Sequence, residues 1–218
     1  VTVYLGQKRG NASTSDFSPQ AIRDTVAAAL SIARYTAEDD CAGLAEKDRL
    51  ARDYPQLALY FPWQLSVEQA IELAKECEQA GFAADPKITN SEGATVSTSE
   101  SQFIYANSLD FMGGYPVSRH SVSCALIAEH NESKQRDYWY SVARDAVDLE
   151  SAQEIGRKTG LRSAARLGAR KIATCEVPVI FEAPIASSLI GHFASAISGG
   201  SLYRKSSFLL DGLGKPIF

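Results

Sequence analysis

The chain has 218 residues, of which 45% are hydrophobic and 22% are charged, and its formal net charge is −4. This composition is typical of a globular protein with one large domain or two small ones, and the absence of a basic block disfavours nucleic-acid binding through bulk electrostatics. No apolar run in the sequence reaches the roughly 18 residues that a membrane-spanning helix needs.

The first elements in chain order are a strand and a helix. Val1, Val3 and Leu5 stand at alternate positions, which predicts a half-buried strand. Ser18 is expected to cap a helix whose first position is Pro19. The apolar positions of this helix repeat at helical spacing and predict one buried stripe, formed by Ile22, Val26, Ala29 and Ala33.

Residues 37–65 form a long linker without clear periodicity, which is unusual in a compact domain. Its large apolar side chains cluster toward its end, at Tyr54, Leu57, Leu59, Tyr60, Phe61 and Trp63. This aromatic content predicts that the linker packs against a domain surface or against a partner. We expect a domain boundary near residue 60, between the end of an N-terminal α/β portion (1–60) and an α+β domain (61–218).

A second helix and a run of strands follow the linker. Ser66 and Gln69 predict a capping box, and Gly81 is expected to end the helix. The side chains expected to face the core are Ala70, Ile71, Ala74 and Cys77. From Ile88 to Val147 the pattern changes to period two. Turns predicted at 90–93, 112–116 and 130–133 divide this region into a four-strand antiparallel meander.

Three elements are predicted in the last third of the chain: a helix at 149–167, a strand at 176–181, and a helix from Pro184 to 198–200. Asp148 is expected to cap the first of these helices and Gly168 to close it. Because strands and helices come in blocks, the sequence indicates an α+β fold with mostly antiparallel sheet and segregated packing helices.

Cysteines and histidines do not form a recognisable ligand pattern. The four cysteines, Cys41, Cys77, Cys124 and Cys175, are widely spaced and are interpreted as isolated buried thiols in a reducing compartment. His120 and His130 lack a second ligand at helical or hairpin spacing, so each is interpreted as a surface or hydrogen-bonded core residue. Residues 136–140 are interpreted first as a half-buried strand and alternatively as an interface anchor.

The segment at 191–207 reads GHFASAISGGSLYRKSS and is similar to a metallopeptidase helix without its metal ligands. A zinc-binding helix needs two imidazoles on one face and a carboxylate beside them as general base. This segment has one histidine, His192, and no carboxylate.

Four segments carry a family resemblance, and they are residues 10–16, 135–141, 167–172 and 194–210, the last reading ASAISGGSLYRKSSFLL. In these segments the chain resembles the TldD/PmbA family, and more closely its PmbA (TldE) branch. Members of that branch are roughly twice as long, so the resemblance implies an internal fragment with a truncated start and without the family's C-terminal domain.

The resemblance also implies a role for the helix near residue 190. In the TldD branch an HExxxH motif binds the catalytic metal, and Ile190 and Ser195 stand where its two histidines would be. Gly191 stands where its glutamate would be. The resemblance therefore implies no catalytic residue, metal ligand or cofactor in this chain, and zinc or another divalent metal in a TldD-like partner subunit.

A second candidate site follows this helix, at Gly199, Gly200, Ser201, Tyr203, Arg204, Lys205 and Ser206. Its backbone and polar side chains could hold an extended peptide or its carboxylate. The alternative is a glycine-terminated helix followed by a solvated polar turn.

Three functions stay open from the sequence. The chain could be part of a PmbA/TldE-like subunit that shapes the peptide channel of a cytoplasmic metallopeptidase complex acting on unfolded or modified peptides. It could be a metallopeptidase in its own right, or a regulatory protein of the kind described as a modulator of DNA gyrase. An open sheet edge also predicts that the fragment forms some homodimer.

Overall fold

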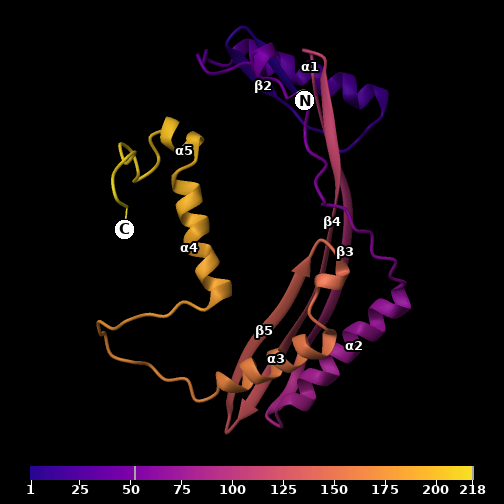
Figure 1. Cartoon of the computed structure of the whole chain (residues 1–218), viewed down its shortest axis with the longest axis vertical. Coiled ribbons are helices and arrows are strands. Elements are labelled where there is room, and N and C mark those ends of the chain that lie inside the picture. The colour runs from indigo at the N-terminus through magenta and orange to yellow at the C-terminus, as the bar shows by residue number, and fades with distance from the viewer. Residues whose placement is uncertain (52, 218) are drawn as a thin grey trace. The chain divides into compact units, whose positions relative to one another are not determined.

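The computed structural model describes residues 1–51 and 53–217. The chain divides into two compact units, Val1–Ala169 and Arg170–Phe218. Helices and antiparallel sheets occur in separate blocks, which confirms the predicted α+β class (Figure 1). The two units separate at Ala169, and the boundary that we predicted near residue 60 remains a prediction. None of the helices in the described ranges combines the length and apolarity that a bilayer crossing needs.

The first unit opens with a hairpin of β1 (Thr2–Leu5) and β2 (Lys8–Asn11), followed by α1 (Pro19–Tyr35). Ser18 caps α1 as predicted, because its hydroxyl accepts the Ala21 N–H. Strand β2 was missed, since its sequence KRGN has no apolar alternation. A side chain at Gly10 would place its Cβ 1.9 Å from the Ala29 carbonyl oxygen, so glycine lets β2 lie directly on α1.

The buried stripe of α1 was predicted only in part. Ala29 and Ala33 are fully buried, as expected, and Thr25 joins them. Ile22 and Val26 remain 43% and 42% exposed, because the small residues of α1 face the hairpin at close range. The predicted stripe is therefore wrong at these two positions.

Helix α2 (Val67–Ala84) has the predicted capping box, in which the Ser66 hydroxyl accepts the Gln69 N–H and the Gln69 side chain accepts the Ser66 N–H. The prediction that Gly81 ends the helix is wrong. Gly81 lies inside α2 and is buried, and of the predicted core side chains Cys77 is fully buried whereas Ile71 is 48% exposed.

Glycines allow α2 to lie against α3 (Ala152–Ala165). A Cβ at Gly156 would lie 1.8 Å from the Cys77 carbonyl oxygen, and a Cβ at Gly160 would lie 2.5 Å from that of Gly81. Gly81 therefore does not end α2. It lies at a close crossing of α2 and α3, where the backbones of the two helices are in contact.

The cap predicted for α3 was also misplaced. Ser151 caps this helix by accepting the Glu154 N–H, while Asp148 ends a short 3-10 helix, η2 (Ala146–Asp148). Gly168 follows the helix with a φ of 76°, as expected for a glycine that closes a helix.

The central sheet has three strands, β3 (Ile88–Asn107), β4 (Phe111–His130) and β5 (Ser133–Ala143), in the antiparallel order β3-β4-β5. The prediction of four strands is wrong. The register of β3 shifts between Ile88 and Asn90 and again between Ser91 and Gly93, inside the strand, and residues 112–116 lie inside β4. The chain turns instead at 108–110, where Asp110 has a φ of 62°. The predicted turn at 130–133 is confirmed by Asn131 and Glu132, which have positive φ.

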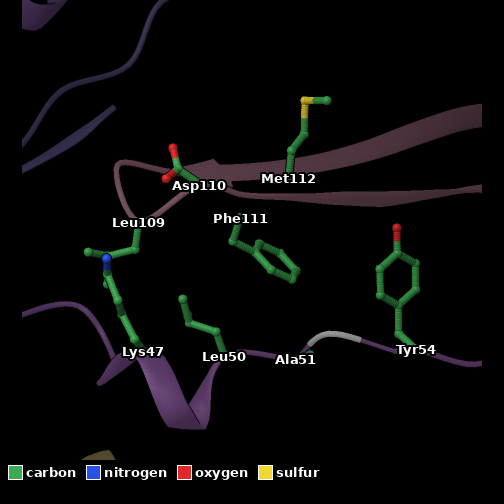
Figure 2. A pocket seen from close by; sticks show the side chains of 8 residues that line it. All are labelled: Lys47, Leu50, Ala51, Tyr54, Leu109, Asp110, Phe111 and Met112. Carbon is green, nitrogen blue, oxygen red and sulfur yellow. The ribbon is translucent and has the colours of Figure 1, made fainter.

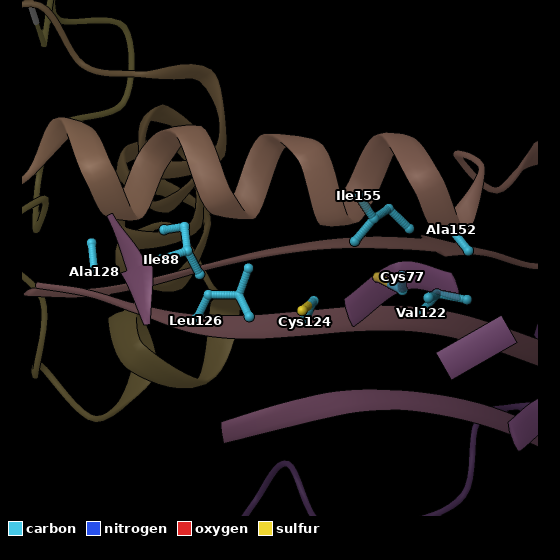
Figure 3. Close-up of a cluster of buried hydrophobic side chains, with 8 residues drawn as sticks. All are labelled: Cys77, Ile88, Val122, Cys124, Leu126, Ala128, Ala152 and Ile155. Atoms are coloured by element: carbon cyan, nitrogen blue, oxygen red, sulfur yellow. The ribbon is translucent and has the colours of Figure 1, made fainter. Parts of the chain in front are cut away.

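The core lies where α2 and α3 cover one half of this sheet (Figures 1 and 3). Its buried side chains are Cys77, Ile88, Val122, Cys124, Leu126, Ala128, Ala152 and Ile155. All four cysteines are free thiols, but only Cys77 and Cys124 are buried, so the prediction of buried thiols is wrong for Cys41 and Cys175.

The other half of the β3–β4 hairpin is an exposed extension, which we call the hairpin arm (residues 97–119). Every residue of β3 from 97 to 106 is exposed. Large apolar side chains are exposed here, among them Phe103, Ile104 and Met112, at 53%, 61% and 76%.

The aromatic linker packs against the base of the arm, as the first of the two predicted alternatives expects. The Leu59 carbonyl accepts the Ser118 N–H at 2.9 Å, and the Phe61 N–H donates to the Ser118 hydroxyl at 2.8 Å. His120 is fully buried, with Nε2 2.8 Å from the Phe61 carbonyl and Nδ1 2.8 Å from the Thr98 hydroxyl. It is therefore a hydrogen-bonded core histidine, one of the two predicted possibilities.

The linker also touches the arm through Tyr60, whose hydroxyl donates to Glu100 at 2.6 Å. This hydrogen bond raises the pKa of Tyr60 above its ordinary value of 10.0, because the carboxylate favours the protonated phenol. We expect Glu100→Ala to lower the Tyr60 pKa toward 10.0 in a carbon-13 NMR titration of the tyrosine rings, with Tyr60→Phe assigning the resonance. An unchanged Tyr60 titration would contradict this contact.

Strand β5 confirms the half-buried strand predicted at 136–140. Trp139 faces α3, where the Lys158 ammonium and the Arg162 guanidinium lie 5.3 and 5.0 Å from the ring. Tyr138 and Tyr140 stack on the other face with ring centroids 6.3 Å apart and are about half exposed.

The second unit holds α4 (Ala183–Ala196) and the short helix α5 (Gly199–Tyr203). The strand predicted at 176–181 is not formed, since those residues are exposed and have no sheet partner among the described residues. Gly199 and Gly200 begin α5 and do not end α4, because Ser198 caps the new helix by accepting the Ser201 N–H.

Candidate functional site

Helix α4 presents the three residues that stand in place of a metal motif. Ile190, Gly191 and Ser195 all lie on this helix, and all three are exposed. Their side chains offer one aliphatic group, no side chain and one hydroxyl, a set that does not fit a divalent metal. Within the described ranges, no group of three His, Cys, Asp or Glu residues is placed to hold a metal ion.

The candidate peptide-contacting residues form a compact turn around α5. The Ser201 carbonyl accepts both the backbone N–H and the hydroxyl of Ser206, at 2.9 and 3.2 Å. Lys205 has a φ of 54°, which turns the chain back after α5. The Arg204 guanidinium lies over Gly200, where an added Cβ would be 3.4 Å from it. The turn therefore brings the predicted residues together, with Arg204 and Lys205 exposed.

A different site, which the sequence did not predict, lies between the hairpin arm and the linker residues 47–51 and 54–57 (Figure 2). Two hollows of about 410 and 330 Å³ share Ala51, Tyr54 and Phe111. We call the pair the hairpin groove. The larger hollow adds Lys47, Leu50, Leu109, Asp110 and Met112, and the smaller adds Pro55, Leu57, Phe103, Tyr105, Gly113, Gly114 and Tyr115.

Aromatic rings and two glycines shape the smaller hollow. Phe103 packs on Tyr115, and Tyr105 packs on Phe111, with ring centroids 5.5 and 5.8 Å apart. A Cβ at Gly114 would lie 2.2 Å from the Phe103 carbonyl oxygen, so glycine allows β4 to lie close to the backbone of β3 beside these rings. The only sign of this hollow in the sequence is the pair Gly113 and Gly114 between two aromatic residues, Phe111 and Tyr115. We had interpreted this pair as part of a turn.

Two family models match the chain. The PmbA/TldA metallopeptidase central domain matches residues 60–167, and the PmbA/TldA metallopeptidase C-terminal domain matches residues 174–218. The chain belongs to the PmbA/TldD family. From the sequence we expected the family's C-terminal domain to be absent. The second match shows instead that residues 174–218 are similar to part of that domain.

Curated relatives support the same assignment. The chain is 47% identical over 217 residues to Metalloprotease PmbA of Escherichia coli O157:H7 and to a Metalloprotease PmbA homolog of Haemophilus influenzae. All of this chain and 48% of each relative are covered, so the chain spans about half the length of the curated relatives it matches.

Solved structures show the same fold. A candidate modulator of DNA gyrase from Bacteroides thetaiotaomicron has a TM-score of 0.87 at 25% identity, covering 99% of this chain and 50% of its own. TldE from Thermococcus kodakarensis has a TM-score of 0.68 at 12% identity, covering 96% and 47%, so the likeness to it concerns the fold alone.

Proposed function

We propose that this chain is part of a PmbA/TldE-like subunit that lacks the HExxxH metal motif and pairs with a TldD-like subunit carrying the divalent metal. The observation that carries the proposal is the chemistry of α4, where Ile190, Gly191 and Ser195 offer neither a metal ligand nor a general base. In the complex this subunit shapes the peptide channel, and bond cleavage occurs at the partner's metal. The substrates are unfolded or modified peptides.

The turn around α5 supports a peptide-contacting role. Arg204 and Lys205 are exposed cations beside a hydroxyl-rich turn, a set of donors suited to peptide carbonyls and carboxylates. The complex is proposed to work in the cytoplasm, where free thiols such as Cys77 and Cys124 stay reduced. Without the partner, the open edge of β3 supports homodimer formation.

The peptide role is tested in the assembled complex with Arg204→Ser and Lys205→Ser. Both variants should raise KM for an unfolded peptide several-fold and leave kcat unchanged, because binding contacts away from the reacting bond act mainly on substrate affinity. The matched controls are Arg170→Ser and Lys171→Ser, which remove exposed cations of the same unit far along the chain from α5. Equal effects from all four substitutions would overturn the proposed contact.

A second candidate function is regulation by protein binding. It is favoured by the fold match to the Bacteroides thetaiotaomicron protein described as a candidate modulator of DNA gyrase. The net charge of −4 argues against direct DNA contact but is compatible with a protein partner. If a complex with a TldD-like subunit cleaves no unfolded peptide, this second function gains support.

A further inference from the structure

The hairpin groove joins an apolar, ring-lined hollow to a second hollow that is lined by one cation, Lys47, and one carboxylate, Asp110. Figure 2 shows Leu109 and Phe111 pointing toward the side on which Lys47 and Leu50 lie, while Asp110 and Met112 point away from it. The ammonium of Lys47 lines the larger hollow on the same side as Leu109 and Phe111. Among the described residues Lys47 forms no ion pair, and the Asp110 carboxylate of the same hollow points away from it, so the Lys47 ammonium can meet a ligand carboxylate.

The adjoining smaller hollow accepts an apolar group. Its 330 Å³ lies at the small end of ligand sites, and its walls are the ring pairs of Phe103 with Tyr115 and Tyr105 with Phe111. A planar or branched side chain could pack edge-on or offset against these rings. Tyr54 closes the hollow from the linker side, since an added Cβ at Gly113 would lie 3.3 Å from its ring.

The two adjoining hollows indicate which chemical groups a ligand would need. An apolar body fits the ring-lined hollow, and a carboxylate fits the Lys47 ammonium beyond the shared residues Ala51, Tyr54 and Phe111. We propose that the hairpin groove binds the carboxyl-terminal residue of a peptide, with its apolar side chain among the rings and its carboxylate at Lys47. This inference rests on the proposed function, because it gives the peptide-handling subunit a preference for one kind of peptide end.

The free edge of β4 gives a reason to favour a side-chain and carboxylate contact over an added strand. Pro116 lies on β4 between the groove and Ser118, and proline has no N–H to donate to a neighbouring strand. At Ser118 the linker already occupies this edge through the Leu59 carbonyl. Addition of a strand at this edge of β4 is therefore disfavoured, which favours a contact through a side chain and a terminal carboxylate.

The test measures binding by the full-length protein without its partner, using acetyl-Ala-Ala-Phe with a free carboxylate as the probe in isothermal titration calorimetry. The amide of the same peptide should bind about tenfold more weakly, since it loses a charge-assisted hydrogen bond. Acetyl-Ala-Ala-Ala with a free carboxylate should also bind about tenfold more weakly, because it leaves the ring-lined hollow empty.

Variants locate the site. Lys47→Gln should abolish the difference between the free acid and the amide, and Tyr54→Ala should abolish the difference between the Phe and Ala peptides. Lys75→Gln is the control, because Lys75 lies on the exposed side of α2 in an ion pair with Glu72. Far-ultraviolet circular dichroism confirms that each variant is folded.

Equal affinity of the wild-type protein for the acid and the amide would overturn the inference, and so would a Lys47→Gln variant that keeps the difference. Selective binding of a peptide with an internal glutamate would also overturn it, since the site would then recognise an acidic side chain. These outcomes are independent of cleavage by the complex, so a failure here is distinguishable from a failure of the proposed subunit role.

Discussion

Replacing Gly156 with alanine is expected to lower the free energy of unfolding of the first unit by about 3 kcal/mol. The new methyl group would lie 1.8 Å from the Cys77 carbonyl oxygen, so α3 must move away from α2. This separation loosens the packing of Ile155 and Leu126, which are fully buried in the core between the helices and the sheet. Urea unfolding followed by circular dichroism measures the loss.

Gly191→Ala is the matched control, because Gly191 also lies in a helix but has no atom within 4 Å of an added Cβ. In an exposed helix alanine is favoured over glycine by about 1 kcal/mol. The same exchange should therefore be neutral or stabilising in α4 and destabilising in α3. Equal effects at the two positions would show that the close helix crossing is not present.

Replacing His120 with alanine is expected to destabilise the first unit by about 2–4 kcal/mol and to release the linker. The buried imidazole joins the Phe61 carbonyl to the Thr98 hydroxyl, and its ring packs edge-on against Trp63 at 5.5 Å. Alanine removes both hydrogen bonds and leaves a cavity. Limited proteolysis should cut residues 37–58 faster in this variant.

His130→Ala provides the comparison on the same strand. His130 is exposed at the end of β4, so its loss should change the unfolding free energy by less than about 0.5 kcal/mol and leave the proteolysis rate unchanged. If the two histidine variants are cut at the same rate, the linker is not held by His120.

Local signals in the sequence predicted the beginnings of α1 and α2. Ser18 and Ser66 cap α1 and α2 as expected, because a cap depends on a hydroxyl and an N–H only three residues apart. The overall α+β class was also predictable, since it follows from the order of periodic segments.

Glycines were misread, because their role depends on a neighbour that is distant in sequence. Gly81 was interpreted as a helix end, but it lies where α2 meets α3. Gly113 and Gly114 were interpreted as a turn, but they lie within β4 beside the rings of the arm. Sequence alone does not distinguish a glycine that turns the chain from one that admits a close neighbour.

The two candidate sites also differ in whether their residues are close together in the sequence. Positions 190, 191 and 195 could be compared with a metal motif because its residues lie on one helix, within one and a half turns. The hairpin groove could not be predicted, because it needs Lys47 and Tyr54 of the linker to meet Phe111 and Gly113 of the arm. The meeting of these segments depends on tertiary contacts such as the one between Leu59 and Ser118.

We propose that this subunit handles peptide without holding the catalytic metal, and its metal content tests that proposal most directly. The full-length protein, a TldD-like subunit and their complex are each purified, and bound divalent metal and cleavage of an unfolded peptide are measured on the same samples. We predict metal and cleavage in the complex, and neither in the full-length protein alone. About one equivalent of metal with cleavage by that protein alone would contradict the account.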